Sequence, residues 1–328
     1  MNRRTLCLGA AAAALTLPLA GCVTVHGERA DIPSVTSAEA ARALAHFASV
    51  NNDATRVYDP ALITRIEGGP LGAIDEAGVR AKHASHPDGN PAFSALAFSD
   101  AHFVIPQQRG WPKFFVADTA TNRSGDARWL LVFRRFAAGQ PWKADFLAVA
   151  AKNEVPAFAT DKDGHAVALP VAGTDLLVQP AQLSATYASY LQKGPAATRV
   201  FASGEATSAL RATRAAHTRS SVSVTQYADQ AAGGGEFTPV ALRTKDGGAL
   251  VFFASHHQSR ATYRAGYRLT VDADTRALMT GTPQTSVTLS HTGQEAVTVP
   301  AGADGSGLGG GKVVFVSRLV GLVSAKGE

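Results

Sequence analysis

Residues 128–134 read Arg-Trp-Leu-Leu-Val-Phe-Arg, and residues 139–143 follow with Gly-Gln-Pro-Trp-Lys. A run of aromatic and branched apolar residues that is bounded by turn residues predicts a β-strand. Such runs predict four strands, at residues 96–105, 114–120, 129–136 and 142–149. The loop at 122–126, Asn-Arg-Ser-Gly-Asp, joins two of them as a hairpin, so the predicted sheet is at least partly antiparallel.

Three helices are predicted before these strands. Residues 36–39, Thr-Ser-Ala-Glu, form a capping box, in which the hydroxyl and the carboxylate satisfy free amides of the first turn. Asp59-Pro60 starts a second helix, which Gly-Gly-Pro at 68–70 ends, and a third helical stretch lies near 74–84. Because an antiparallel sheet needs a cover over one face, this part of the chain is predicted to be an α+β domain.

The second half of the chain repeats this order. A helix begins at Pro180, and Ala-Thr-Arg-Val-Phe at 197–201 echoes Ala-Thr-Arg-Val-Tyr at 54–58. A hairpin, Lys-Asp-Gly-Gly at 245–248, again precedes an apolar strand. These echoes favour an internal duplication. The predicted organisation is a signal peptide at 1–21, a lipidated tether at 22–36, a first α+β domain at 37–152, a linker at 153–179 and a second α+β domain at 180–328.

Helices followed by a long curved antiparallel meander resemble the nuclear-transport-factor-2-like (cystatin-related) cone. The strand at 128–134 and the Gly turn with Trp142-Lys143 are similar to the last two strands of that superfamily. The resemblance implies tandem cones of helices on a curved sheet. The second copy departs from it, because Ala-Thr-Tyr-Arg at 261–264 replaces the Trp-Lys pair. Additional strands are expected at 287–289, 297–299 and 313–316.

The first 22 residues form an export signal. Arg3 and Arg4 precede an uncharged apolar stretch at 6–20, which is shorter than a membrane-spanning helix and contains Pro18. Leu-Ala-Gly-Cys at 19–22 resembles the lipobox of bacterial lipoproteins. That resemblance implies cleavage after Gly21 and acylation of Cys22, with chains such as palmitate. The lipid would hold the protein on the outer face of the bacterial cytoplasmic membrane.

Two alternatives concern this leader. An ordinary signal-peptidase site would leave Cys22 as an unmodified residue. The paired arginines also resemble a twin-arginine signal, although two arginines equally make a plain n-region. With its lipobox, alanine-rich composition and duplicated helix-plus-meander pattern, the whole chain resembles uncharacterised actinobacterial lipoproteins. That resemblance supplies a location and no activity.

Composition restricts the possible functions. The chain has 328 residues, of which 45% are hydrophobic and 17% charged, so it can bury a globular core. Its net charge of +5 is too small to predict a nucleic-acid surface. Cys7 lies in the leader and Cys22 in the lipobox, so the mature protein lacks the thiols that a disulfide, a cysteine–zinc site or a cysteine nucleophile needs.

Motif-like strings are better explained as loops and turns. Residues 305–310, Gly-Ser-Gly-Leu-Gly-Gly, match a dinucleotide fingerprint, but a strand rather than a helix is expected after them. Asp-Lys-Asp-Gly at 161–164 lacks the closing glutamate of a calcium loop. Histidines at 83, 86, 256 and 257 have no obvious third ligand, so neither a metal nor another cofactor is predicted. The common hydrolase, zinc-protease and penicillin-binding motifs do not occur.

Polar residues on otherwise apolar strands are the candidates for a ligand pocket in the first half. They are His102, Asp118 and Arg134, with Trp111 and Trp129 as walls. The alternative is that they lie on the solvent face of the sheet. We therefore predict a lipid-anchored extracytoplasmic protein that binds a small molecule or a cell-envelope partner. The alternatives are a cone-shaped enzyme using Asp118 and His102 as an acid–base pair, which is less favoured, and a purely structural envelope component.

Overall fold

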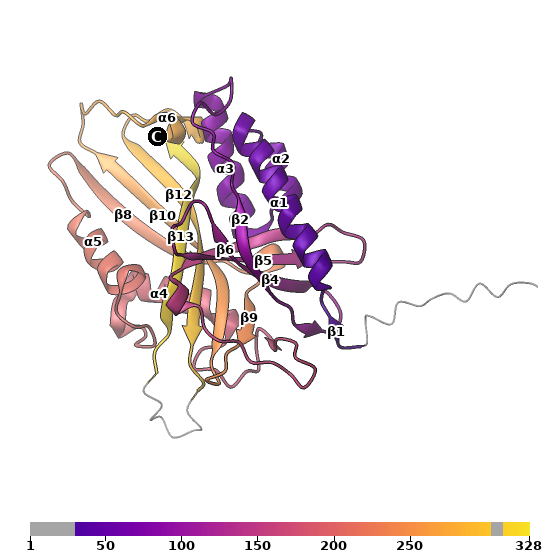
Figure 1. Cartoon of the computed structure of the whole chain (residues 1–328). Coiled ribbons are helices and arrows are strands. Elements are labelled where there is room, and N and C mark those ends of the chain that lie inside the picture. Colours follow the sequence, from indigo (N-terminus) through magenta and orange to yellow (C-terminus); the bar gives the residue numbers. More distant parts are fainter. Residues whose placement is uncertain (1–29, 303–310) are drawn as a thin grey trace, which may run out of the picture.

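The computed structural model describes residues 30–302 and 311–328. These residues form four layers: a group of helices, a first sheet, a second sheet and a second group of helices (Figure 1). The predicted cleavage site at Gly21, the lipid site at Cys22 and the glycine-rich string at 305–310 lie outside the described residues. Among the described residues, no helix is long and apolar enough to cross a bilayer.

The first layer contains three helices close to the predicted positions. They are α1 (Ser37–Val57), α2 (Pro60–Ile66) and α3 (Gly69–Ser85). The Thr36 hydroxyl accepts a hydrogen bond from the Glu39 amide, and the Asp59 carboxylate caps α2 at the Ala61 amide. The predicted helix starts at 36–39 and 59–60 are therefore confirmed. The carboxylate half of the predicted capping box is not formed, because Glu39 Oε1 accepts hydrogen bonds from Arg135 and Trp142 instead.

The first sheet is an antiparallel meander in the order β2-β4-β5-β6. Its strands are β2 (Phe98–Val104), β4 (Lys113–Thr121), β5 (Arg128–Arg135) and β6 (Lys143–Ala150). Alternation along β5 sends Leu131 and Phe133 toward α1–α3, and Leu130 and Val132 toward the second sheet. Both faces of β5 are therefore buried, whereas the edge strand β2 is mostly exposed. Two short strands, β1 (Ile32–Pro33) and β3 (Gln107–Gln108), pair with each other beside it.

The second sheet has seven strands. Six of them follow the order β11-β13-β12-β10-β9-β7, and β8 also pairs with β10. The strands are β7 (Ala168–Leu169), β8 (Ser223–Ala231), β9 (Val240–Arg243), β10 (Ala249–Tyr263), β11 (Met279–Gly281), β12 (Ser286–Val299) and β13 (Val314–Gly327). The four long strands β8-β10-β12-β13 form an antiparallel meander, as the first sheet does. The strand segments expected at 287–289 and 297–299 belong to one continuous strand, β12.

Helical elements cover the outer face of the second sheet (Figure 1). The α-helices of this half are α4 (Pro180–Lys193), α5 (Leu210–Ala216) and α6 (Ala273–Ala277). Shorter turns complete the chain: η2 (Lys152–Glu154), η3 (Gly194–Ala196), η4 (Glu205–Ala209) and η5 (Gly235–Phe237). Tyr187 and Leu183 of α4 are fully buried against this sheet.

The two sheets share one hydrophobic core. Phe146 of the first sheet and Phe252 of the second meet in it, with ring centroids 6.3 Å apart. Backbone amides of the edge strand β6 also donate hydrogen bonds to side chains of the second sheet. The Leu147 amide donates to Gln294 Oε1 at 2.7 Å, and the Val149 amide donates to Ser317 Oγ at 3.0 Å. Such contacts leave fewer unpaired amides on that edge.

The α+β class and the antiparallel sheets are confirmed, whereas the repeat is less regular than its sequence suggests. Residues 54–57 end α1, but their echo at 197–201 follows η3 without helical structure. The segment 153–179, predicted as a linker, packs into the protein: Ala166 enters the core between the sheets, and Leu176 and Val178 enter the core under α4. Tertiary packing thus gives similar pentapeptides different conformations.

Gly78 in the middle of α3 gives a first testable prediction. A Cβ built on Gly78 meets nothing within 4 Å, and the position has helical dihedral angles. Gly78→Ala should raise the free energy of unfolding by about 0.5–1 kcal/mol, because alanine loses less backbone entropy in a helix. Gly139→Ala is the matched control: its Cβ is equally free, but its φ of +78° is strained for alanine, so stability should fall. Urea denaturation of both variants tests this, and a loss of stability in Gly78→Ala would contradict it.

Candidate functional site

The five residues predicted from the strands do not converge on one cavity. His102 and Asp118 are opposite each other in the register of β2 and β4, but each binds another side chain. His102 Nε2 lies 3.0 Å from Asp100 Oδ1, and its side chain is 66% exposed. Asp118 Oδ1 accepts a hydrogen bond from Arg128 Nε at 2.6 Å. The carboxylate of Asp118 is therefore already neutralised by a guanidinium.

Arg134 and Trp111 also have partners away from a pocket. The Arg134 guanidinium is buried between the sheets, where its Nε is 3.0 Å from Asp145 Oδ2 and its Nη2 donates to the Thr238 carbonyl. Burial raises the pKa of Asp145 to about 7 even though Arg134 opposes the rise. Trp111 stacks beneath the cations of Lys113 and Arg135. Of the five residues, Trp129 lines a cavity on the helix side of the first sheet.

This cavity, which we call the α1–α3 pocket, lies between the three helices and the first sheet and has a volume of about 220 Å³. Most of its wall is apolar, and its polar lining residues come from α1, from α3, from β5 and from the hairpin after β4. The lining residues are Phe47, Asn51, Thr55, Ile63, Leu71, Asp75, Gly78, Val79, Leu96, Arg123, Trp129 and Leu147. A mainly apolar cavity with a few polar groups is the usual form of a small-molecule site.

One acidic side chain lines this pocket, and a second lies close to it. Asp75 lines the pocket from α3, and Glu67, which follows α2, is only 2% exposed. Burial raises the pKa of Asp75 to about 6. Burial also raises the pKa of Glu67 well above its ordinary value, the charge of Asp75 adds to this rise, and the side chain of Asn51 opposes it. The pair therefore releases its protons less readily than free carboxyl groups.

Several buried polar atoms around the pocket have no hydrogen-bond partner in the described structure. They are Asn51 Oδ1, Trp129 Nε1 and both carboxylate oxygens of Glu67. Leaving a buried polar atom unpaired costs about 1–3 kcal/mol, so folded proteins rarely keep several together. The Trp129 Nε1–H donor and the Asn51 Oδ1 acceptor thus lack a partner beside this pocket, while the carboxyl of Glu67, whose raised pKa favours its protonated form, can donate as well as accept.

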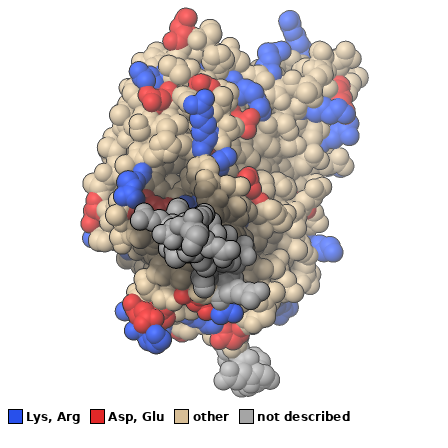
Figure 2. All heavy atoms as spheres, turned by 90° about the vertical axis from the view of Figure 1, so that its right-hand side faces the viewer, with Lys and Arg blue, Asp and Glu red and all other residues tan. Residues whose placement is uncertain are grey.

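The rim of the pocket carries a basic side chain. Arg123, in the hairpin after β4, lines the opening, and its Nη2 donates to the Ser94 carbonyl at 2.8 Å. On the face of the molecule turned to the viewer in Figure 2, basic and acidic side chains are interspersed rather than gathered by sign. The charged side chains that line the pocket are Asp75 and Arg123, and the buried Glu67 lies beside Asp75.

A second buried polar cluster lies under α4, on the helix side of the second sheet. His257 Nδ1 is 2.6 Å from Asp229 Oδ1, and His257 Nε2 is 2.8 Å from Ser255 Oγ. The Ser255 hydroxyl donates to Glu295 Oε1 at 2.6 Å. Arg214 Nη1 donates to Asp229 at 2.8 Å, so this carboxylate has two cationic or polar partners. We call these side chains the Asp229–His257 network.

The hydrogen bonds from Ser255 to His257 and from His257 to Asp229 have the distances found in a nucleophilic triad, but the surroundings of Ser255 do not fit that role. Ser255 has no exposed surface, and its hydroxyl proton is directed to Glu295 rather than available for transfer to His257. A nucleophile must be reached by its substrate. A Cβ on Gly293 would lie 2.7 Å from Ser255 Oγ, which shows how closely the backbone covers the serine. The network therefore acts as a buried support of the second sheet.

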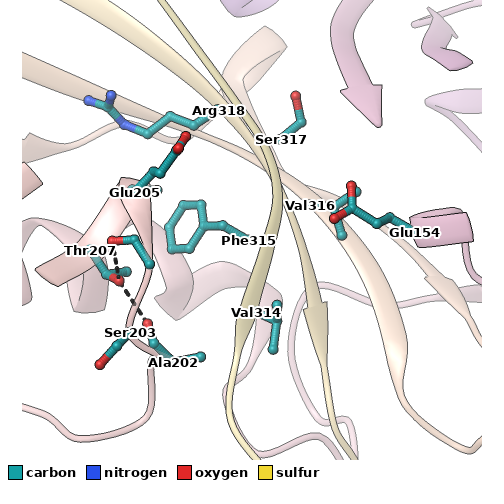
Figure 3. Close-up of a pocket in the computed structure, with 12 residues that line it drawn as sticks. Glu154, Ala202, Ser203, Glu205, Thr207, Val314, Phe315, Val316, Ser317 and Arg318 are labelled. Carbon is teal, nitrogen blue, oxygen red and sulfur yellow. Dashed lines mark hydrogen bonds between the residues drawn. The ribbon is translucent and has the colours of Figure 1, made fainter. Parts of the chain in front are cut away.

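Beside the network, a more open hollow of about 430 Å³ lies between the turn at 202–207 and β13 (Figure 3). Phe315 and Arg318 extend from β13 on the side where Glu205 lies, whereas Glu154 and Val316 lie on the other side of the strand. Arg318 Nη2 reaches 3.3 Å from His257 Nε2, so this hollow borders the network. Within residues 30–302 and 311–328, no group of three or more His, Cys, Asp or Glu side chains could hold a metal ion.

Comparisons with known proteins agree with one another. Residues 31–325 match the family described as a domain of unknown function, DUF8094. The chain is 44% identical over 322 residues to an uncharacterized lipoprotein of Streptomyces coelicolor, an alignment that covers 98% of this chain and 94% of the relative. It is 42% identical over 319 residues to an uncharacterized lipoprotein of Streptomyces avermitilis, covering 97% and 94%. A further uncharacterized lipoprotein of Streptomyces coelicolor is 26% identical over 345 residues. No solved structure matches this chain.

Proposed function

We propose that this chain, which belongs to the DUF8094 family, is a lipoprotein that is cut after Gly21 and held by acylated Cys22 on the outer face of the cytoplasmic membrane. The names of its relatives and the lipobox support the anchor. Acyl chains contribute about 0.8 kcal/mol per buried methylene, so two or more of them make a stable anchor. Export by the twin-arginine route would rest on Arg3 and Arg4 alone.

The two halves, 37–152 and 180–328, are the two cone-like units of this proposal. Each places helices on one face of an antiparallel meander of four long strands, which supports a common origin. The segment 153–179 would then be the connection that became packed between them. The shared core between the sheets would hold the two units in a fixed relation.

The function of the protein is to bind a small molecule in the α1–α3 pocket. The observation that carries this proposal is the set of unpaired buried polar atoms, Asn51 Oδ1 and Trp129 Nε1 above all, in the wall of an otherwise apolar cavity. A purely structural component would be expected to fill such a cavity with its own side chains. An acid–base role of Asp118 with His102 is disfavoured, because Arg128 holds the Asp118 carboxylate.

Trp129→Phe tests this function. The change keeps an aromatic wall but removes the Nε1–H donor, so a bound molecule that accepts this hydrogen bond should be held about tenfold more weakly. The measurement is native mass spectrometry of the full-length protein, extracted from its own membrane in mild detergent. We expect the native protein to carry an extra mass that denaturation releases, and Trp129→Phe to carry less of it.

Trp111→Phe is the matched control, because Trp111 lies outside the pocket and packs against Lys113 and Arg135. It should retain the full extra mass. Equal loss in both variants, or no releasable mass from the native protein, would contradict a small-molecule function of this pocket. The chemical identity of the released compound would also show whether a cell-envelope component is the natural occupant.

A further inference from the structure

We propose that the α1–α3 pocket selects a small organic cation, with an ammonium group facing Asp75 and Asn51 and an apolar body between Phe47 and Trp129. This inference deepens the proposed function and rests on it. Four features of the described residues carry it: the balance of charge in the pocket, an unpaired acceptor, the aromatic walls and the size of the cavity.

The charge balance comes first. Neither half-buried Asp75 nor buried Glu67 takes part in any ion pair among the described residues, although the buried acids Asp145, Asp229 and Glu295 all lie within 4 Å of an arginine or histidine nitrogen. A carboxylate in an apolar site is stable only if it takes up a proton or meets a cation. Arg123, the one basic side chain in the lining of the pocket, donates to the Ser94 carbonyl and forms no ion pair with either acid. Once Asp75 is ionised, a bound cation would therefore supply the partner that the described residues do not.

The second feature is an unpaired acceptor on α1. Asn51 is only 6% exposed, lines the pocket, and has no partner for its Oδ1 acceptor. An ammonium group is a pure donor with up to three N–H bonds, so it can satisfy Asn51 and Asp75 together. A carboxylate or phosphate ligand offers acceptors alone and would be repelled by both acids. A hydrocarbon would leave Asn51 unpaired.

The walls and the volume restrict the rest of the ligand. Phe47 and Trp129 are aromatic, and a cation close to the face of such rings gains further attraction. Ile63, Leu71 and Val79 provide an apolar surface for a hydrocarbon body. A cavity of about 220 Å³ is smaller than most drug-sized sites, so the body is limited to a single ring or a short chain.

The pKa of Asp75 also favours a cation as the ligand. Burial raises the pKa of Asp75 to about 6, so its carboxyl is mostly ionised above neutral pH and mostly protonated at pH 5. An amine remains protonated over this range. Cation binding should therefore weaken as the pH falls below about 6, whereas binding of a neutral molecule of the same shape should change little.

The experiment compares three probes of nearly equal shape: benzylammonium, benzyl alcohol and benzoate. Isothermal titration with the full-length protein in detergent measures each affinity near pH 7.5 and pH 5. We expect benzylammonium to bind about tenfold or more tighter than benzyl alcohol at the higher pH, and benzoate not to bind. At the lower pH the advantage of the cation should shrink.

Two variants, Asp75→Asn and Glu76→Gln, test whether the preference for a cation depends on the charge of Asp75. Asp75→Asn should abolish the preference for the cation, while Glu76→Gln, on the next position of α3 but paired with Arg80 outside the pocket, should leave it unchanged. If benzyl alcohol binds as tightly as benzylammonium in a Trp129-dependent manner, the pocket binds small molecules but the cation inference is wrong. If no probe binds and the native protein carries no releasable mass, the proposed function fails as well.

Discussion

Asp229→Ala should lower the free energy of unfolding by about 3–5 kcal/mol, the range found when one partner of a buried ion pair is removed. Asp229 is 4% exposed and holds both Arg214, at 2.8 Å, and His257, at 2.6 Å. Its removal leaves the buried imidazole of His257 and the partly buried guanidinium of Arg214 without their acceptor. Urea denaturation at neutral pH measures the loss.

Asp175→Ala is a matched control, because Asp175 also pairs with an arginine, Arg243, at 2.6 Å, but its side chain is 66% exposed. Exposed pairs contribute about 0.2–1 kcal/mol, so this variant should remain close to the native protein. Similar losses in the two variants would show that the Asp229–His257 network does not stabilise the second half through its burial.

The network also predicts how stability depends on pH. Burial alone would lower the pKa of His257, but the hydrogen bond with Asp229 and the nearby carboxylate of Glu295, 3.8 Å from Nε2, outweigh it and raise the pKa above its ordinary value. Burial would raise the pKa of Asp229, but His257 and Arg214 outweigh it and lower the pKa. The His257 contribution is complete below about pH 6.5 and is lost as the pH rises through its folded-state pKa. The Asp229 contribution is complete above about pH 3.9 and is lost as the pH falls. The network therefore stabilises most between these values.

The α+β class and the helices and strands of the first half were predictable from the sequence because their signals are local. These signals depend on neighbours a few positions away in the chain. The structure shows the helix starts predicted at 36–39 and 59–60 and the strand predicted from the apolar run at 128–134. The stacking of the two sheets was not predictable, because nothing local specifies which strand face meets another sheet. β5 buries both of its faces, and this is a property of the whole chain.

Apart from Trp129, the polar residues of the pocket were missed, although part of their signal was present. The buried face of α1 contains Ala40, Leu44, Phe47, Asn51 and Ala54, and in this series Asn51 stands where an apolar residue is expected. Asp75 occupies the equivalent place between Leu71 and Val79 of α3. A polar residue on the apolar face of a predicted helix would have been the better guide than polar residues on strands.

The Asp229–His257 network was harder to find. His257 and Ser255 alternate with apolar residues along β10, but their partner Asp229 faces His257 only through the register of β8 and β10. Glu295 reaches the same place through the register of β10 and β12, where it lies opposite Phe253. Registers between strands far apart in the chain follow from the complete fold, so a single sequence does not specify these contacts.

Asp75→Asn should make the ligand-free protein more stable above neutral pH, by up to about 3 kcal/mol. Burial raises the pKa of Asp75 from 3.8 to about 6, and one pKa unit corresponds to about 1.4 kcal/mol. An acid whose folded-state pKa is raised destabilises the fold once it ionises, so the native protein should lose stability as the pH rises from about 4 to 7. Asparagine has no such charge and also relieves the repulsion on Glu67.

The test is urea denaturation of both proteins, stripped of any bound molecule, near pH 8 and near pH 4. The two should differ at the higher pH and converge at the lower one, where Asp75 is protonated in the native protein. Glu76→Gln should show no such dependence, because Glu76 is partly exposed and paired with Arg80. A less stable Asp75→Asn near pH 8 would mean that the carboxylate already has a compensating partner. In a binding site, replacing a charged residue can stabilise the empty protein. The charge of Asp75 is unfavourable while the pocket is empty and becomes favourable when a cation occupies it.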